Sequence, residues 1–147
     1  MSDLLADLYQ ELVIDHSRQP RNRGPLPEAT HDAKGHNPLC GDEITLRLRL
    51  DGDRVVDAKF EGHGCAISTA SASLMTEAIR GKSKAELVAL FEAMHRLLTG
   101  GEAGMALGKL EAFSGVRDFP ARVKCAALAW HTLKNAIEAP GETARTE

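Results

Sequence analysis

Two neighbouring segments with a strict alternation of apolar and polar residues constrain the fold most strongly. The alternating apolar residues are Ile44, Leu46, Leu48 and Leu50 in the first segment and Val56, Ala58 and Phe60 in the second. A period of two places these side chains on one face of a sheet. The linking Asp51-Gly52-Asp53 contains residues that tolerate positive φ, so the two segments are predicted to form an antiparallel hairpin.

Four other segments carry the spacing or the capping signals of helices. They run from about Asp3 to Arg18, from the Ser- and Ala-rich stretch after Cys65 to Gly81, from Ser83 to Leu98, and from Pro120 to just before Pro140. Glu86 follows Ser83 by three residues and completes a capping box, and Pro120 suits a first helical turn. We therefore expect an α+β fold, in which a small antiparallel sheet of two to three strands is covered on one face by the N-terminal helix and the C-terminal helices.

The remaining segments are expected to be irregular. Proline and glycine are frequent between Gln19 and Leu39, which predicts an extended loop. Residues 102–116 are expected to hold a short helix within a flexible insertion, and residues 141–147 to form a frayed, disordered tail. The chain has 147 residues and a hydrophobic fraction of 43%, which suits a single domain over residues 1–147.

Charge and hydropathy exclude several classes of partner. The net charge of -3 arises from 21 acidic and 18 basic residues mixed along the chain, so no basic face for nucleic acid is expected. Asp3, Asp7 and Glu11 make the N-terminus unlike a signal peptide, and no stretch approaches the roughly 20 apolar residues of a membrane helix. Three cysteines in a chain that needs no disulfide indicate a reducing compartment, and we expect a cytoplasmic protein.

The hairpin itself predicts a meeting of two thiols. Its turn lies near Gly52, so it pairs positions whose numbers sum to about 105 and brings Cys40 opposite Cys65. Asp42 is two residues from Cys40, so in an extended chain both side chains point to the same side. Zinc takes thiolates and accepts a carboxylate, which makes these three residues candidate ligands, although Asp42 beside a glycine also suits a turn carboxylate.

Cys125 lies near the start of the last predicted helix, after Pro120. The positive end of the helix dipole and the neighbouring Arg122 and Lys124 both favour a thiolate of lowered pKa. A buried core cysteine is the other interpretation, and the position alone does not decide between them.

The motifs together resemble one family, the iron-sulfur cluster assembly proteins of the IscU and SufU type, and SufU more closely. The matching blocks are Tyr9, Ile14-Asp15-His16, Pro20-Arg21-Asn22-Arg23-Gly24, Asn37-Pro38-Leu39-Cys40-Gly41-Asp42, Phe60-Glu61-Gly62-His63-Gly64-Cys65-Ala66-Ile67-Ser68, Ala70-Ser71-Ala72-Ser73, Phe119-Pro120-Ala121-Arg122-Val123-Lys124-Cys125 and Leu128-Ala129-Trp130. They span nearly the whole chain and occur in order.

The resemblance implies a metal site made of Cys40, Asp42, Cys65 and Cys125. It also implies a zinc cofactor or a transient iron-sulfur cluster, a pyridoxal-phosphate cysteine desulfurase of the SufS type as partner, and downstream components of iron-sulfur assembly. In the SufU-like role Cys40 accepts sulfur from the desulfurase, and Arg122 is expected to stabilise the transferred anionic sulfur.

Two features favour this zinc-dependent sulfur acceptor over a cluster scaffold. IscU-like members have a histidine before the third cysteine and a Leu-Pro-Pro-Val-Lys stretch, where this chain has Lys124 and Phe119-Pro120-Ala121-Arg122-Val123. The chain also has the 99–118 insertion typical of SufU-like members. A scaffold holding a [2Fe-2S] cluster and a non-catalytic zinc-stabilised interaction module remain alternatives. A Cys-His hydrolase using His36 or His63 is disfavoured, because no oxyanion pocket is indicated.

Overall fold

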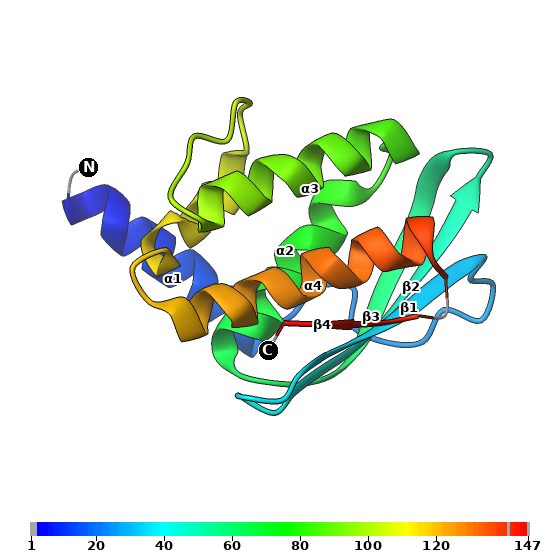
Figure 1. The fold of residues 1–147 in the computed structure, drawn as a ribbon, viewed down its shortest axis with the longest axis horizontal. Coiled ribbons are helices and arrows are strands. Elements are labelled where there is room, and N and C mark those ends of the chain that lie inside the picture. Colours follow the sequence, from blue (N-terminus) through cyan, green and yellow to red (C-terminus); the bar gives the residue numbers. More distant parts are fainter. Residues whose placement is uncertain (1–2, 141, 147) are drawn as a thin grey trace.

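The computed structural model describes residues 3–140 and 142–146. The elements in chain order are α1 (Asp3–Arg18), β1 (His31–Asn37), β2 (Asp42–Asp51), β3 (Arg54–His63), α2 (Ala66–Ile79), α3 (Lys84–Leu98), the 3-10 helix η1 (Gly108–Val116), α4 (Pro120–Glu138) and β4 (Thr143–Arg145). Figure 1 shows helices laid over a curved sheet, with α1 at the end away from most of the sheet. This arrangement confirms the predicted α+β class.

The predicted hairpin is present as β2 and β3. The two strands are antiparallel, Leu50 pairs with Val55, and the register shifts by one residue between Arg49 and Leu50. Because of this shift Leu46 pairs with Phe60, and both side chains are buried on the same face. The alternation therefore predicted the strands and the buried face of β2. In β3 the prediction that Val56 faces inward was wrong: the register shift leaves Val56 43% exposed and turns Val55 into the core instead.

The sheet is larger than expected, with four strands in the order β3-β2-β1-β4 rather than two to three. Strand β1 lies in the segment that we predicted to be an extended loop, and it pairs antiparallel to β2. Its buried residues are Ala33, Gly35 and Asn37, which give no aliphatic alternation. Small residues are required here because a Cβ on Gly35 would overlap Thr132 Oγ1 of α4 and come within 2.9 Å of Ile44 Cγ2.

The segment expected to be a frayed tail also contributes to the sheet. Strand β4 pairs parallel to β1, with Ala144 opposite Gly35 and buried. The tail prediction for residues 142–146 therefore differs from the structure, whereas residues 141 and 147 lie outside the described residues. Three residues with one inward side chain are too short to show a strand pattern in the sequence.

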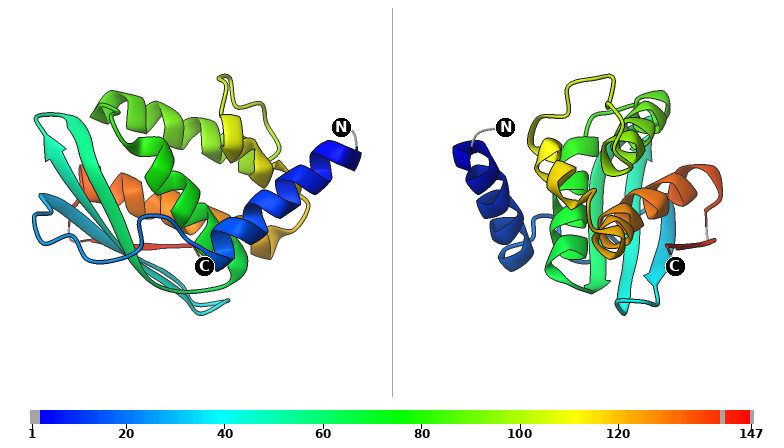
Figure 2. Two further views of the ribbon diagram at one scale, coloured as in Figure 1. Left: turned by 180° about the vertical axis from the view of Figure 1, so that it is seen from behind. Right: turned by 60° about the vertical axis from the view of Figure 1, so that its left-hand side comes forward.

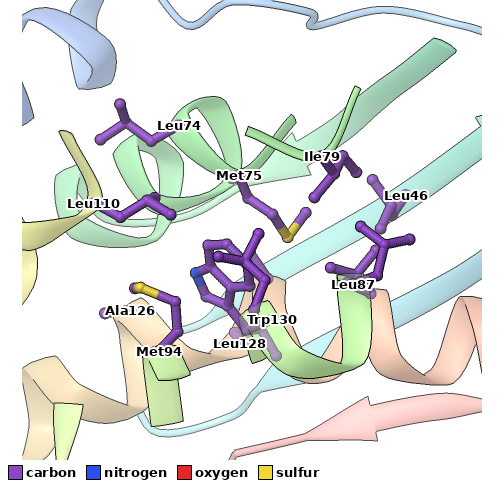
Figure 3. Close-up of a cluster of buried hydrophobic side chains, with 14 of the residues drawn as sticks. Leu46, Leu74, Met75, Ile79, Leu87, Met94, Leu110, Ala126, Leu128 and Trp130 are labelled. Atoms are coloured by element: carbon purple, nitrogen blue, oxygen red, sulfur yellow. The ribbon is translucent and has the colours of Figure 1, made fainter. Parts of the chain in front are cut away.

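Helices cover one face of the sheet, as predicted, but the direct cover comes from α2 and α4, and the N-terminal helix α1 packs on this helical layer rather than on the strands. Helix α4 packs on β1 and β2 and against α2 and α3, while α1 packs on α2 and η1. Figure 2 shows these layers from two further sides, with α1 outside α2. In the core between the layers, Trp130 of α4 lies among Met75, Met94 and Leu128 (Figure 3). The sequence signals for α3 and α4 are confirmed by the capping box of Ser83 and Glu86 and by Pro120 in the first turn.

The insertion folds back onto the helices. The short helix predicted within residues 102–116 is the 3-10 helix η1, which packs against α1, α3 and α4. Among the described residues, no helix has the length and apolarity needed to cross a membrane.

Candidate metal centre

Three separate elements bring the cysteines to one end of the molecule. Cys40 lies in the four-residue turn between β1 and β2, Cys65 is the N-cap of α2, and Cys125 lies in the second turn of α4. Figure 1 shows the cyan turn and the starts of green α2 and orange α4 gathered at this end. Asp42 is the first residue of β2, so it leaves the same turn that carries Cys40.

Three of the four predicted ligands form a compact group. The Sγ atoms of Cys40 and Cys125 are 3.3 Å apart. One ligand atom from each of Cys40, Asp42 and Cys125 lies within 4.8 Å of the others. Residues separated by as much as 85 positions in the sequence thus meet at one point.

Cys65 lies beside this group and is connected to it through Asp42. Its backbone N–H donates a hydrogen bond to Asp42 Oδ1 at 2.9 Å. Its Sγ atom accepts a hydrogen bond from the Ser68 N–H at 3.4 Å, as the cap of α2. The thiol lines the same cavity as Cys40 and Cys125, although it is not a member of the compact group.

A residue that the sequence analysis did not select completes the arrangement. Asn37, the last residue of β1, has no exposed surface, and its Cα is paired with that of Asp42. Its Nδ2 donates to Asp42 Oδ2 at 3.2 Å and lies 3.6 Å from Cys125 Sγ. Asn37 therefore positions two candidate ligands at once. We missed this role because the strand that Asn37 ends was predicted to be a loop.

Burial sets the acidity of the Cys125 thiol. The residue is 3% exposed, and this burial raises the pKa of its thiol well above the ordinary value, with contacts to Cys40, Asp42 and Cys65 acting in the same direction. Of the two interpretations that the sequence left open, the structure supports the buried core cysteine over a thiolate whose pKa the helix dipole, Arg122 and Lys124 lower. Lys124 instead lines a separate cavity on α4. Desolvation therefore dominates in the metal-free protein.

The thiols open onto a cavity of about 610 Å³. Its other walls are mainly apolar and come from α1, α2, η1 and the start of α4; they include Tyr9, Val13, Ile67 and Val116. Arg122 also lines the cavity, with its guanidinium 4.6 Å above the ring of the exposed Phe119. Cys40 is exposed, Cys65 is half-buried and Cys125 is buried, so the thiols form a gradient from solvent to core.

The donor set fits a soft divalent ion. Two sulfurs and a carboxylate converge, with a third sulfur beside them, and zinc accepts these ligands in a tetrahedron at about 2.0 to 2.3 Å. Asp42 is fully buried, and no Lys, Arg or His among the described residues forms an ion pair with it. Buried carboxylates are usually paired with a cation or coordinate a metal. Within the described residues, a cation at this point would supply that missing partner.

The histidines considered for hydrolase chemistry are not part of this group. The His63 side chain is 72% exposed and lies 3.3 Å from Glu43 Oε2. The compact group found within the described residues contains no histidine. The arrangement is that of a metal or sulfur site rather than of a Cys-His pair.

Comparisons with known proteins agree with this chemistry. Residues 8–126 match the model of the family described as NifU-like N-terminal domain. A Bacillus subtilis protein named zinc-dependent sulfurtransferase SufU is 44% identical over 135 residues, which cover 90% of this chain and 91% of that protein. A Thermotoga maritima protein named iron-sulfur cluster assembly scaffold protein IscU is also 44% identical, over 89% of this chain and 93% of its own.

A solved structure shows the same fold. The crystal structure of a putative iron-sulfur cluster assembly scaffold protein for the SUF system from Fervidobacterium islandicum AW-1 superposes with a TM-score of 0.83 at 39% identity. The match covers 92% of this chain and 99% of that one.

Proposed function

Since this chain belongs to the family of NifU-like N-terminal domains, we propose that it is a zinc-dependent sulfur acceptor for iron-sulfur cluster assembly. In this role it takes persulfide sulfur from a pyridoxal-phosphate cysteine desulfurase and passes it to downstream assembly components in the cytoplasm. The observation that carries the proposal is an exposed thiol, Cys40, at 3.3 Å from a buried one, Cys125, beside a buried carboxylate.

The acceptor is Cys40. A persulfide on another protein reaches only an exposed sulfur, and Cys40 is the exposed member of the three thiols. The exposed apolar side chains of Ile14, Leu39 and Phe119 lie on α1, next to Cys40 and before α4, and offer a surface for a protein partner.

The transfer is a thiol exchange. The Cys40 thiolate attacks the outer sulfur of the partner's persulfide, so that a new S–S bond forms at Cys40 Sγ. The S–S bond within the partner's persulfide breaks, and its cysteine leaves as a thiolate with the electron pair. One sulfur atom thus moves from the partner's cysteine to Cys40, and no external oxidant or reductant is needed. Arg122, on the wall of the same cavity, is placed to attract the anionic sulfur on Cys40.

The residues that would hold zinc are Cys40, Asp42, Cys65 and Cys125, and the bound ion would keep the thiols deprotonated. Asn37 orients Asp42 by donating to its Oδ2, and the Cys65 N–H fixes the other oxygen. These two hydrogen bonds hold Asp42 in place whether or not Cys40 is engaged. The acceptor can thus leave the group while Asp42 stays oriented.

A compact ligand group supports a single ion. Two thiolates at about 2.3 Å from one tetrahedral zinc lie roughly 3.8 Å apart, so the Cys40 and Cys125 sulfurs, 3.3 Å apart, would need to separate by only about 0.5 Å to bind the same ion. A cluster scaffold is the second candidate function, because a relative named as a scaffold is as similar to the chain as the one named as a sulfurtransferase.

The test uses the purified protein with a cysteine desulfurase of the SufS type and cysteine. We expect the wild-type protein to stimulate alanine production and to gain one sulfur atom on Cys40, detected by mass spectrometry of the alkylated protein. Cys40→Ala should abolish both effects. Val56→Ala, an exposed apolar change on β3 outside the residues lining the thiol cavity, should change neither and serves as the control.

Three outcomes distinguish the candidates. Unchanged stimulation by Cys40→Ala would refute the acceptor role. Iron with acid-labile sulfide in anaerobically purified protein, followed by transfer to an apo-ferredoxin, would support the scaffold. Zinc whose removal unfolds the domain, with no persulfide on any thiol, would indicate a structural zinc module.

A further inference from the structure

A second cavity, of about 190 Å³, lies between α3, α4 and the C-terminal strand β4. Four of its nine lining residues carry basic side chains, His95, Lys124, His131 and Arg145, and the described lining residues include no acidic one. This composition is unusual in a chain of net charge -3. We propose that this cavity binds a small oxyanion of the phosphate class, held by Lys124 and Arg145 together with His95 and His131.

The basic groups lack carboxylate partners among residues 3–140 and 142–146. None of these four side chains is in the ion pairs formed by that part of the chain. Burial lowers the pKa of His131, and the nearby His95 and Lys134 lower it further. His131 is therefore neutral near pH 7 and can donate a hydrogen bond, while Lys124 and Arg145 supply the positive charge that an anion in the cavity would offset.

A buried hydroxyl also lacks a partner at this place. Thr146 lines the cavity and is 9% exposed, and its Oγ1 forms no hydrogen bond with the described part of the chain. Buried polar atoms are nearly always hydrogen-bonded, so this atom calls for a partner. Because Oγ1 itself is buried from solvent, the Thr146 side chain would have to rotate toward the cavity to donate to a phosphate oxygen, and the basic side chains would supply the other contacts.

The size of the cavity indicates a small ligand. Pockets for drug-sized molecules enclose about 300 to 1,000 Å³, and this cavity is smaller. It is also distinct from the thiol cavity. Lys124, Ala127 and His131 follow one another at helical spacing along one stripe of α4, whereas Ala121, Arg122 and Cys125 lie on the stripe that lines the thiol cavity. The inference therefore does not rest on the proposed function.

The experiment measures the thermal midpoint and the histidine NMR signals of the full chain during titration with inorganic phosphate, against chloride at matched ionic strength. At phosphate tenfold above its dissociation constant, we expect a rise of roughly 3 to 5 °C. The ring C–H signals of His95 and His131 should shift with the same saturation curve. A parallel titration with glycerol 3-phosphate compares free phosphate with a phosphate monoester, and the ligand with the lower dissociation constant is the one that the cavity prefers.

Variants test the location. His95→Gln combined with Arg145→Gln should weaken phosphate binding at least tenfold, while leaving the zinc content unchanged. Lys59→Gln removes a positive charge on β3 outside the lining of this cavity, and should leave phosphate binding unchanged. Absence of saturable shifts at His95 and His131, or equal weakening by Lys59→Gln, would overturn the proposal.

Discussion

Replacing Asn37 by alanine should weaken metal binding far more than it weakens the fold. The side chain is fully buried and donates from Nδ2 to Asp42 Oδ2 at 3.2 Å, with Cys125 Sγ at 3.6 Å. Its loss leaves one oxygen of a buried carboxylate without a donor and frees the carboxylate to rotate. A hydrogen bond to a charged group contributes about 1.5 to 3 kcal/mol, which corresponds to roughly 10- to 100-fold in affinity.

The assay is competition for zinc between the protein and a chromophoric chelator, together with urea unfolding of the metal-free form. We expect a 10- to 100-fold fall in zinc affinity for Asn37→Ala. Asn37→Asp keeps the side-chain volume but places an acceptor against Asp42 Oδ2, so the zinc affinity of this variant should fall at least as much. Asn135→Ala, on the half-buried face of α4, is the control and should keep the wild-type affinity.

If Asn37→Ala and Asn37→Asp fold and bind zinc within about twofold of the wild type, the hydrogen bond to Asp42 does not position a ligand.

Three other predictions concern stability. Gly35→Ala should lower the free energy of unfolding in urea by about 1 to 3 kcal/mol, because the added methyl overlaps α4. Gly115→Ala adds its methyl in open space and should change that free energy by no more than about 0.5 kcal/mol. Equal effects of the two substitutions would contradict the close contact at Gly35. Burial raises the pKa of Cys125, so the folded metal-free protein holds this proton more tightly than the unfolded chain does. The free energy of unfolding should therefore fall as the pH rises above 9.0, and Cys125→Ala should flatten this dependence on pH. Burial lowers the pKa of His16 below 6.5, so the unfolded chain takes up this proton more readily and stability should fall as the pH drops below that value. If the urea midpoint of His16→Gln falls with pH as much as that of the wild type, this assignment is refuted.

The sequence predicted the elements whose signals are large or local. The β2–β3 hairpin has four large aliphatic residues in strict alternation in β2, and α3 has a complete capping box at Ser83. Strand β1 was missed because contact with α4 demands small inward residues, so Gly35 and Ala33 hide the period of two. The packing that defines this strand comes from a helix about 100 residues later in the chain and is therefore absent from any local pattern.

For the site, too, the local features could be predicted from the sequence and the features set by tertiary packing could not. The hairpin register predicted that Cys40 lies opposite Cys65; the strand pairing ends at Glu43 and His63, and beyond it both thiols line one cavity, to which the family resemblance added Cys125. The sequence left the direction of the Cys125 pKa undecided, because helix position is readable from sequence whereas desolvation is set by the tertiary fold. The role of Asn37 depended on the missed strand, and its pairing with Asp42 became visible only with that strand in place.

The turn between β1 and β2 has a mechanical consequence for the acceptor. Asn37 and Asp42 are anchored at its two ends by strand pairing and burial, and Gly41 between them adopts φ +70°. Cys40 thus lies in a turn of four residues, 38–41, between two ends fixed by strand pairing. In the proposed acceptor role, sulfur on Cys40 would therefore be presented from a turn whose two ends are held by the sheet.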